Sequence, residues 1–478
     1  MDSRPDARTR TSARTLLAAC AATALSAAAV WFGTGLHPLW WMAWLAPVPM
    51  LWLAMRSGWR TWVPATLVAF ALGSFNLWAY LHDRLHLPAS VIVQLIVLPA
   101  VVATLLVALF RAWMRRGQPL RAALATAATA TAIAFASAAA SPHGTWGDIA
   151  YTQMDALPVI QVAALTGLWG IGFVMWWVAA CVVAALAPAA SRNARMRAGM
   201  GAVAMLVAML GFAAWRLVAD TPVAEARVGL LAVDGPIRAD VGTPAGAALL
   251  QRYVAGIEHL ADAGATVVVM PETVFASSRT RIAPLADVAR QRNVRLVAGV
   301  DHRSGPGEEQ NMAVAQVADT TFAYAKQHLL PVLEGQYRPG NATLHLPGTP
   351  RMALAVCKDL DFSQVGRDNA GTQLLLAPAW DFGVDGWLHA RMAMLRGVEN
   401  GFALARNARD GCMTLSDDRG RVLLDESSTG DVVATTGTLP LRETRTLYAR
   451  WGDWFAWACV AVSALLLAAL VLRRRVIR

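Results

Sequence analysis

Three side chains whose types can carry acyl-transfer chemistry stand in the second half of the 478-residue chain. Cys357 offers a thiol, which becomes a nucleophile when a base removes its proton and positive charge stabilises the thiolate. Glu272 can serve as that base, and Lys326 can stabilise an oxyanion. Lys326 is one of only two lysines among the 42 basic residues. A lysine kept in an arginine-rich chain indicates that the position needs a compact ammonium that can lose its proton, which the planar guanidinium of arginine does not provide.

Each of these side chains, taken alone, also has an ordinary structural interpretation. A cysteine that ends a buried strand is usually a small core residue. A glutamate at a strand end usually forms a salt bridge, and a loop lysine is usually solvated. We interpret His328 and His389 as structural, and no cluster of ligating side chains indicates a metal site.

The segments around these residues predict an α/β layer fold, because short apolar strands alternate with amphipathic helices. Glu272 follows the apolar run 265–270, and Cys357 ends the run 351–357. Strand ends favour chemistry, because the backbone is fixed there while the side chain faces a cleft. The expected strands are 226–233, 265–270, 294–300, 311–318, 351–357, 372–378 and 401–406, with later short strands to about 437, and the expected helices lie near 244–263, 281–292, 363–370 and 386–399.

The composition places the remainder of the chain in a membrane. Hydrophobic residues make up 56% of the sequence, too many for an ordinary soluble protein of this size. Most of the apolar runs reach the ~20 residues that a helix needs to cross a bilayer. They lie at 15–33, 39–55, 61–81, 88–110, 120–140, 159–187, 198–218 and 454–472. We therefore predict eight transmembrane spans, seven before residue 220 and one near the C-terminus.

Arginines gather in alternate loops between these runs, which predicts that both termini are cytoplasmic and that residues 219–450 are exported. The arginines are Arg4, Arg8, Arg10 and Arg14, then Arg56 and Arg60, then Arg111, Arg115, Arg116 and Arg121, then Arg192, Arg195 and Arg197, and finally Arg473, Arg474, Arg475 and Arg478. Residues 219–450 hold 23 basic and 26 acidic residues, so the net charge of +10 comes from the membrane part. The basicity is a topology signal and does not indicate nucleic-acid binding.

The predicted division of the chain follows from these patterns. A cytoplasmic tail (1–14) precedes a membrane domain of seven helices (15–218), and a soluble α/β domain follows (219–450). An eighth span (451–472) and a second basic tail (473–478) complete the chain. Five scattered cysteines are too few for a disulfide framework.

The motifs around the candidate residues resemble those of the nitrilase (carbon–nitrogen hydrolase) superfamily. The similar stretches are Met270–Thr273, Tyr324–Pro331 with Glu334, Cys357–Asp359, Ala379–Gly383 and the later Arg396–Gly401. The resemblance implies an αββα sandwich in which Glu272 is the general base, Lys326 stabilises the tetrahedral intermediate and Cys357 is the nucleophile. It also implies that Glu334 is a second functional glutamate. We predict that Lys358, Asp359 and Trp380, which lie in or beside these motifs, are supporting residues.

Within this superfamily, the arrangement of the predicted membrane spans resembles that of the bacterial apolipoprotein N-acyltransferase family. Seven spans, an exported nitrilase-like domain and an eighth span are its architecture, and the segments Ser141–Gly147 and Gly167–Gly170 are similar to its membrane half. The family implies a phospholipid acyl donor, a thioester on Cys357 and a lipoprotein acceptor with an N-terminal diacylglyceryl-cysteine. It places the chain in the bacterial inner membrane with the catalytic domain in the periplasm, and it requires no metal or organic cofactor.

Two departures from the family pattern leave the acceptor open. Lys358 and Asp359 stand where typical members have an aromatic residue and then a glutamate, and we expect Lys358 to add positive charge that favours the thiolate. The segment 332–337 lacks the usual glycine before the second glutamate. The alternatives are an N-acyltransferase with another amine acceptor, a membrane-bound amidase that passes the acyl group to water, and a non-catalytic module. The complete set of Glu272, Lys326 and Cys357 argues against the last.

Overall fold

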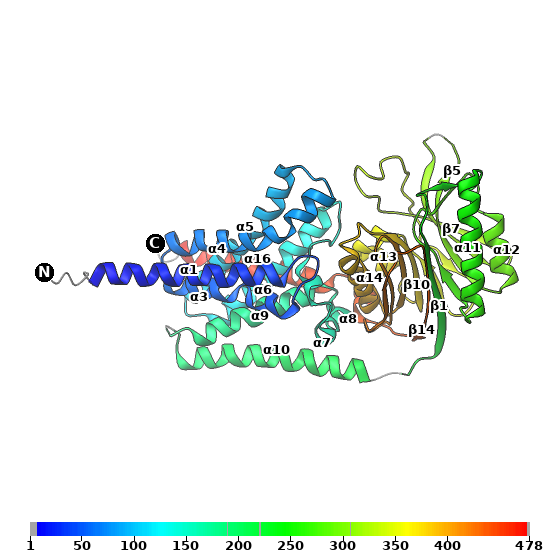
Figure 1. Cartoon of the computed structure of the whole chain (residues 1–478). Coiled ribbons are helices and arrows are strands. Elements are labelled where there is room, and N and C mark those ends of the chain that lie inside the picture. Colours follow the sequence, from blue (N-terminus) through cyan, green and yellow to red (C-terminus); the bar gives the residue numbers. More distant parts are fainter. Residues whose placement is uncertain (1–6, 189, 219–220, 306, 476–478) are drawn as a thin grey trace.

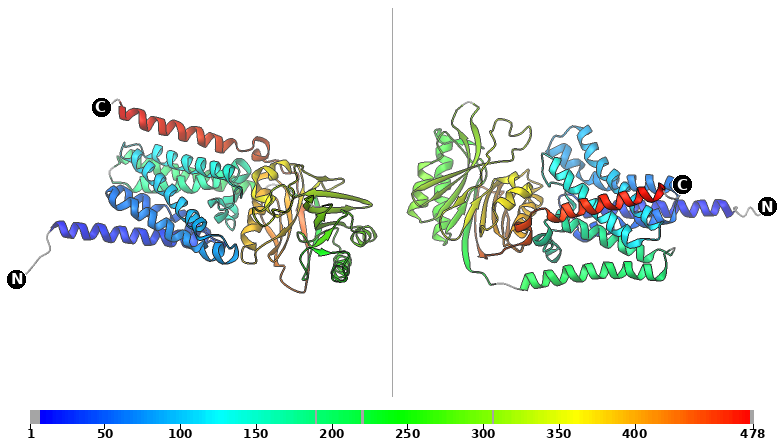
Figure 2. Two further views of the ribbon diagram at one scale, coloured as in Figure 1. Left: turned by 90° about the horizontal axis from the view of Figure 1, so that it is seen from above. Right: turned by 180° about the vertical axis from the view of Figure 1, so that it is seen from behind.

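The computed structural model describes residues 7–188, 190–218, 221–305 and 307–475. Arg4 and Arg478 of the two basic tails lie outside the described residues. A bundle of helices forms one end of the molecule, and two β-sheets with their own helices form the other (Figure 1). Both ends of the chain lie where the bundle faces away from the sheets, as the views in Figure 2 also show.

Seven helical segments of the described chain are long and apolar enough to cross a membrane. They are Arg14–Gly33, Trp59–Arg84, Ala89–Met114, Pro119–Ala140, Trp169–Leu186, Arg192–Val218 and Trp454–Leu472. The prediction of eight such spans is not confirmed, because the run 39–55 forms two short helices, α2 (Trp40–Leu45) and α3 (Val48–Arg56). The break falls at Pro47, whose backbone has no N–H to continue the helix.

The broken pair of α2 and α3 returns alongside α1 (Ala7–Gly33) in the opposite direction. Ala46 packs with Val30 near the end of α1, whereas Met50 and Leu53 lie in the same cluster as Ala19, which is earlier in α1. The chain therefore reverses direction between α1 and α4 despite the break. The other helices of the bundle are α4 (Trp59–Ser74), α5 (Ala89–Met114), α6 (Pro119–Ala140), α9 (Trp169–Leu186), α10 (Arg192–Val218) and α16 (Trp454–Arg475), with short turns η1 (Phe75–Leu77), η2 (Tyr80–Arg84) and η3 (Ile149–Gln153).

The apolar run 159–187 is also interrupted, because α7 (Leu157–Ile160) and α8 (Ala163–Thr166) precede α9 as separate short helices. Gly167 ends α8 with a φ of +68°, and a Cβ at this position would lie 2.5 Å from the ring of Tyr448. Tyr448 belongs to α15 (Leu447–Trp451), just before the final span. Gly167 therefore permits a close approach between the bundle and the segment that leads into α16.

Gly167→Ala is expected to destabilise the protein by about 2–4 kcal/mol, because a strained left-handed backbone adds to overpacking against Tyr448. Gly117 is a matched control, since its φ is +69° but nothing lies within 4 Å of an added Cβ. Gly117→Ala is expected to cost only about 1–2 kcal/mol. Thermal unfolding of the two detergent-solubilised variants measures the difference, and equal losses would contradict the proposed contact.

Two β-sheets packed face to face form the centre of the other domain. The first has the strand order β14-β1-β3-β5-β4-β2, with β6 and β7 added beside β5, and the second has the order β13-β12-β11-β10-β9-β8. The strands are β1 (Ala224–Val233), β2 (Ala239–Asp240), β3 (Val267–Val269), β4 (Phe275–Ser277), β5 (Arg295–Arg303), β6 (Glu309–Val317), β7 (Thr320–Ala325), β8 (His345–Leu346), β9 (Met352–Leu354), β10 (Leu374–Trp380), β11 (Ala403–Arg409), β12 (Cys412–Ser416), β13 (Val422–Ser427) and β14 (Val432–Leu441).

Helices cover the outer face of each sheet and complete an αββα sandwich. α11 (Pro244–Asp262) and α12 (Ala283–Gln291) pack on the first sheet. α13 (Ser363–Asp368) and α14 (Gly386–Asn400) lie between the second sheet and the helix bundle (Figure 1). One apolar cluster contains residues of both α14 and the bundle, among them Met392 and Trp169. The sandwich is therefore joined to the bundle by a continuous core.

Candidate active site

The candidate residues come from both sheets and meet where strands of each sheet end. Glu272 lies between β3 and β4, which pair with successive parts of β5. This segment crosses directly over Gly299 of β5, where an added Cβ would lie 2.4 Å from the Cα of Glu272. The backbone N–H of Glu272 then donates to the Ala379 carbonyl of the second sheet at 3.1 Å. Glycine at position 299 thus lets the Glu272 backbone leave the first sheet and contact the second.

Lys326 follows β7 and bridges two buried carboxylates. Its Nζ lies 2.8 Å from Glu272 Oε1 and 2.9 Å from Glu334 Oε2, and the Lys326 side chain is only 3% exposed. Asn311 of β6 donates its Nδ2 to both Glu272 and Glu334. The Leu330 backbone N–H binds Glu334 Oε2 at 2.6 Å. One cation and two neutral donors therefore hold the two glutamates side by side.

The charges of this cluster shift one another's proton affinities. Burial raises the pKa of Glu272, an effect that Lys326 opposes and Glu334 reinforces. Burial alone would lower the pKa of Lys326, but Glu272, Cys357 and Glu334 together raise it well above its usual value. Lys326 is therefore a fixed ammonium, and Glu272 has an enhanced affinity for a proton. A base with a raised pKa is suited to accept a proton from a thiol.

Cys357 begins a short 3-10 helix, η4 (Cys357–Asp361), and its backbone φ of +45° is in the left-handed region. Non-glycine residues in this region cost about 1–3 kcal/mol and often lie at functional sites. The thiol is half-buried, and Sγ lies 3.5 Å from the carbonyl oxygen of Trp380. Burial and Glu272 raise the pKa of the thiol, while Lys326 opposes them. The resting thiol is therefore protonated and lies in the electrostatic field of Glu272 and Lys326.

The Lys358 ammonium has its own contacts beside the segment that carries the thiol. Its Nζ lies 3.1 Å from His143 Nδ1 and 3.7 Å from Asp361 Oδ2. Cys357 raises the pKa of Lys358, so the two groups are coupled with the sign that the sequence predicted, but burial and Glu272 still keep the pKa of the thiol raised. The Lys358 ammonium thus contacts His143 and Asp361, while the thiol contacts the Trp380 carbonyl.

Asp359 is fully buried and joins the lysine segment to the cysteine segment. Its carboxylate accepts from the backbone N–H groups of Gln327, His328 and Val356 and from the hydroxyl of Tyr324, at 2.8–3.1 Å. Two of these donors directly follow Lys326, and one directly precedes Cys357. Asp359 therefore fixes the relative position of the two segments through charge-assisted hydrogen bonds.

Asp359→Ala is expected to destabilise the protein by about 3–5 kcal/mol, because four donors lose a buried acceptor. Asp359→Asn keeps one acceptor oxygen and should lose roughly half as much. Thermal unfolding of the purified variants checks the order. Alanine and asparagine variants as stable as the wild type would show that the hydrogen bonds of Asp359 do not hold the two segments together.

The remaining candidate residues occupy the wall beside the thiol. Trp380 contributes its carbonyl oxygen to the contact with Cys357, while its indole N–H donates to Asp410 at 3.0 Å. The next residue, Asp381, forms a two-pronged ion pair with buried Arg406. Arg406 also acts electrostatically on the thiol by lowering its pKa. These residues help to hold Cys357 in place and shift the pKa of its thiol, but we assign none of them as a further base.

Two residues of the site were not singled out by the sequence. Asn311 starts a predicted strand, and its polar side chain at a strand end is the same kind of signal that marked Glu272. His143 belongs to the membrane domain, and only the tertiary fold brings it to Lys358. His328 stacks on Phe362 with ring centroids 3.6 Å apart, and His389 pairs with Asp385. Within the described residues, no group of three or more His, Cys, Asp or Glu side chains is arranged to hold a metal ion.

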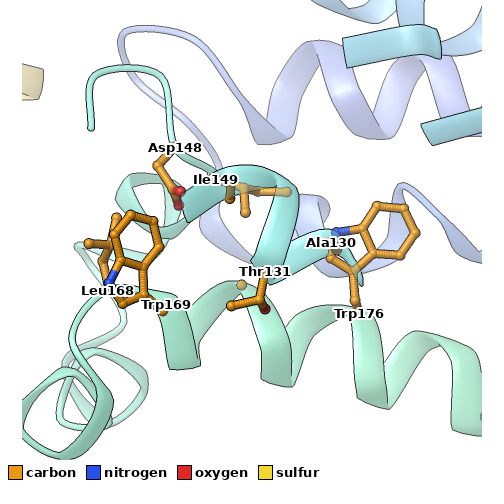
Figure 3. A pocket seen from close by; sticks show the side chains of 9 residues that line it. Ala130, Thr131, Asp148, Ile149, Leu168, Trp169 and Trp176 are labelled. Atoms are coloured by element: carbon orange, nitrogen blue, oxygen red, sulfur yellow. The ribbon is translucent and has the colours of Figure 1, made fainter. Parts of the chain in front are cut away.

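A separate pocket lies in the seam between α6 and α9 and contains no candidate catalytic residue. It encloses about 260 Å³, including the part that is open to the surroundings. Figure 3 shows the Asp148 carboxyl group near the ring of Trp169 at this pocket. Its lining consists of Ala130, Thr131, Ala134, Asp148, Ile149, Leu168, Trp169, Gly172 and Trp176.

The fold and the site define a class of protein, in which an αββα sandwich with a cysteine, a lysine and glutamates is attached to a bundle of apolar helices. Residues 22–181 match the family model described as the apolipoprotein N-acyltransferase N-terminal domain. Over most of its length the chain is similar to proteins named apolipoprotein N-acyltransferase.

Individual comparisons extend over most of the chain. The apolipoprotein N-acyltransferase of Bradyrhizobium diazoefficiens is 26% identical over 387 residues, which cover 69% of either chain. The enzyme of that name from Gloeobacter violaceus is 29% identical over 67% of this chain and 66% of its own. For Nitrosomonas europaea the identity is 26%, over 87% of this chain and 92% of the relative. Among solved structures, an amidase of the nitrilase superfamily from Nesterenkonia is 20% identical with a TM-score of 0.39, and covers 45% of this chain and 90% of its own.

Proposed function

We propose that the chain transfers an acyl group from a phospholipid to the N-terminal α-amine of a diacylglyceryl-cysteine lipoprotein, through a thioester on Cys357. The observation that carries the proposal is the buried cluster of Glu272, Lys326 and Glu334 beside the half-buried thiol. This cluster belongs to a chain related to the apolipoprotein N-acyltransferases. The triad of Glu272, Lys326 and Cys357 supplies a base, an oxyanion partner and a nucleophile.

In the first half-reaction, Cys357 attacks an ester carbonyl of the phospholipid while Glu272 accepts the thiol proton. The carbonyl oxygen becomes an oxyanion, which the Lys326 ammonium stabilises. The C–O bond to the glycerol then breaks, and Glu272 returns the proton to the leaving oxygen. The products are a lysophospholipid and an S-acylated Cys357.

In the second half-reaction, the neutral amine of the acceptor attacks the thioester. Lys326 again holds the oxyanion, and Glu272 takes the proton that the amine loses as the new C–N bond forms. The C–S bond breaks, and Glu272 passes that proton to the thiolate of Cys357, which restores the starting state. Two half-reactions on one cysteine make a ping-pong cycle.

We further propose that both termini are cytoplasmic and that the catalytic domain lies on the periplasmic side of the bacterial inner membrane. The arginine-rich loops support this orientation through the positive-inside rule. Placing the catalytic domain at this surface brings the thiol to two lipid-anchored substrates. A reporter fused near residue 440 should read as periplasmic, and a reporter after the last span should read as cytoplasmic. A cytoplasmic result at residue 440 would overturn the orientation.

The acceptor is tested by adding substrates in sequence to the purified full-length protein. The protein is first incubated with labelled phospholipid and freed of excess donor, and a diacylated lipopeptide is then added. The expected product is the lipopeptide with one additional acyl chain on its α-amine. If the label left the protein as free fatty acid at the same rate with and without lipopeptide, the chain would be a hydrolase. If only another amine accepted the label, the chain would be an acyltransferase of different specificity.

A further inference from the structure

Lys358 is a buried cation beside the nucleophile that the triad mechanism does not use. Its side chain is 6% exposed, and its Nζ lies 5.6 Å from the ring centre of Phe362. A lysine ammonium carries three N–H donors. In the part of the chain that the structure describes, His143 is the partner within hydrogen-bond distance of Nζ, and the carboxylate of Asp361 lies farther away at 3.7 Å. Two donors of the ammonium are thus available to a further acceptor.

Burial of this ammonium is only partly offset by its neighbours. Burial lowers the pKa of Lys358, while Asp361 and Cys357 oppose that shift and Lys326 adds to it. Burial and Lys358 also lower the pKa of His143, so the imidazole is neutral and accepts the lysine N–H. The Asp361 carboxylate pairs with this ammonium at 3.7 Å, beyond hydrogen-bond distance, and a second anion that reached the ammonium would stabilise it further.

The position of Lys358 is the junction between the membrane domain and the catalytic domain. His143 belongs to the loop after α6, and Thr145 of the same loop donates its backbone N–H to the Asp361 carbonyl at 2.9 Å. Gly144 packs so closely that an added Cβ would lie 2.6 Å from that carbonyl oxygen. A loop of the membrane domain is therefore docked on the turn that carries the thiol and the ammonium. The thiol and the ammonium therefore belong to a turn that contacts the membrane domain directly.

We propose that Lys358, together with His143, forms the binding site for the phosphate group of the acyl-donor phospholipid. The inference rests on the proposed function, because it concerns the donor of the first half-reaction. In a glycerophospholipid, the acyl carbonyl and the phosphate are joined through one glycerol unit. Cys357 and Lys358 are consecutive residues, with Cα atoms about 3.8 Å apart. One lipid can thus contact the thiol with its ester and the ammonium with its phosphate.

The chemistry of the two groups suits a phosphate diester. Ammonium-to-phosphate hydrogen bonds are charge-assisted, and they are strengthened where water is excluded. The neutral His143 ring keeps one lysine N–H occupied, which orients the remaining donors without neutralising the charge. Binding of the phosphate would hold the ester carbonyl near Sγ and raise the effective concentration of the reacting groups.

The test compares two donors that share acyl esters and differ in the phosphate. Full-length wild type, Lys358→Met and Lys358→Arg are assayed for thioester formation with dioleoyl phosphatidylglycerol and with dioleoylglycerol in the same detergent. Lys358→Met removes the charge with little change of length. We expect it to raise KM for the phospholipid at least tenfold and to leave KM for dioleoylglycerol within twofold. Lys358→Arg should restore most of the phospholipid KM. Arg290→Met, on the outer helix α12 with its side chain 54% exposed, is the control for a lost surface charge.

Two other results would contradict the phosphate site or the proposed function. An equal loss with both donors in Lys358→Met would overturn the phosphate site and leave a purely structural role for Lys358. A wild type that forms no thioester with either donor would refute the proposed function itself. Inorganic phosphate at millimolar concentration distinguishes the sources of the anion. Phosphate that competes with the phospholipid in the wild type and not in Lys358→Met would support the headgroup site. Phosphate that binds the wild type and not Lys358→Met, without raising KM for the phospholipid, would show a site for free phosphate and contradict a lipid headgroup site.

Discussion

Cys357→Ala is expected to abolish acyl-enzyme formation and to reduce N-acylation at least about 1000-fold, because no other group of the cluster can form the thioester. The side chain that is removed is small and half-buried, so the fold should remain intact. The measurement is transfer of label from phospholipid to protein, followed by transfer to the lipopeptide. Both signals should be lost together.

Cys412 provides the matched control for this variant. It is the other half-buried free cysteine of the catalytic domain, at the start of β12, and burial raises its pKa to about 11. Cys412→Ala should retain the label on the protein. If Cys412→Ala lost the label and Cys357→Ala kept it, the nucleophile would have been assigned to the wrong residue.

Lys326→Met is expected to have the second-largest effect, on both stability and catalysis. Removing the ammonium leaves the buried carboxylates of Glu272 and Glu334 with Asn311 as their shared side-chain donor. Breaking a buried ion pair on one side costs about 3–5 kcal/mol. Loss of the oxyanion partner should lower the rate of thioester formation by a further factor of about 100–1000. Thermal unfolding and single-turnover labelling measure the two effects separately.

Two companion variants separate the roles of Lys326. Lys326→Met combined with Glu334→Gln removes one of the two carboxylates, so it should recover part of the lost stability without recovering activity. Lys326→Arg keeps a positive charge, but the larger, planar guanidinium of arginine does not fit the position that the compact ammonium occupies between two carboxylates. It should therefore fold more stably than Lys326→Met and still fail to form the thioester. An Lys326→Arg protein with wild-type activity would contradict the role of the ammonium.

The strands and helices of the sandwich were largely predictable, because their apolar alternation is strong. The expected helix 244–263 appears as α11 at Pro244–Asp262, and the expected strand 372–378 appears as β10 at Leu374–Trp380. β7 at Thr320–Ala325 was missed, because its mixed polar sequence is typical of a hairpin strand at a sheet edge. The expected strands 294–300 and 311–318 both extend farther than predicted, because β5 continues to Arg303 and β6 begins at Glu309, where the two strands pair antiparallel.

The candidate residues were predictable from motif order, but their local geometry was not. The strand before Cys357 ends at Leu354, and Cys357 has a left-handed backbone that no glycine in the sequence signals. Asn311 and His143 depend on contacts between distant segments, which local patterns do not record. The direction of Lys358 depends on the same turn. The sequence therefore indicated which residues could react, and the tertiary structure was needed to find the partner of each.

The central claim is that Cys357 carries the acyl group from a phospholipid as a thioester. It is tested most directly by mixing full-length protein with an unlabelled phospholipid, quenching in acid and measuring the mass of the intact protein and of the Cys357 peptide. The expected result is an added mass of one acyl chain on that peptide, which neutral hydroxylamine removes. An unmodified Cys357 peptide from protein that still produces N-acylated lipopeptide would contradict the thioester mechanism.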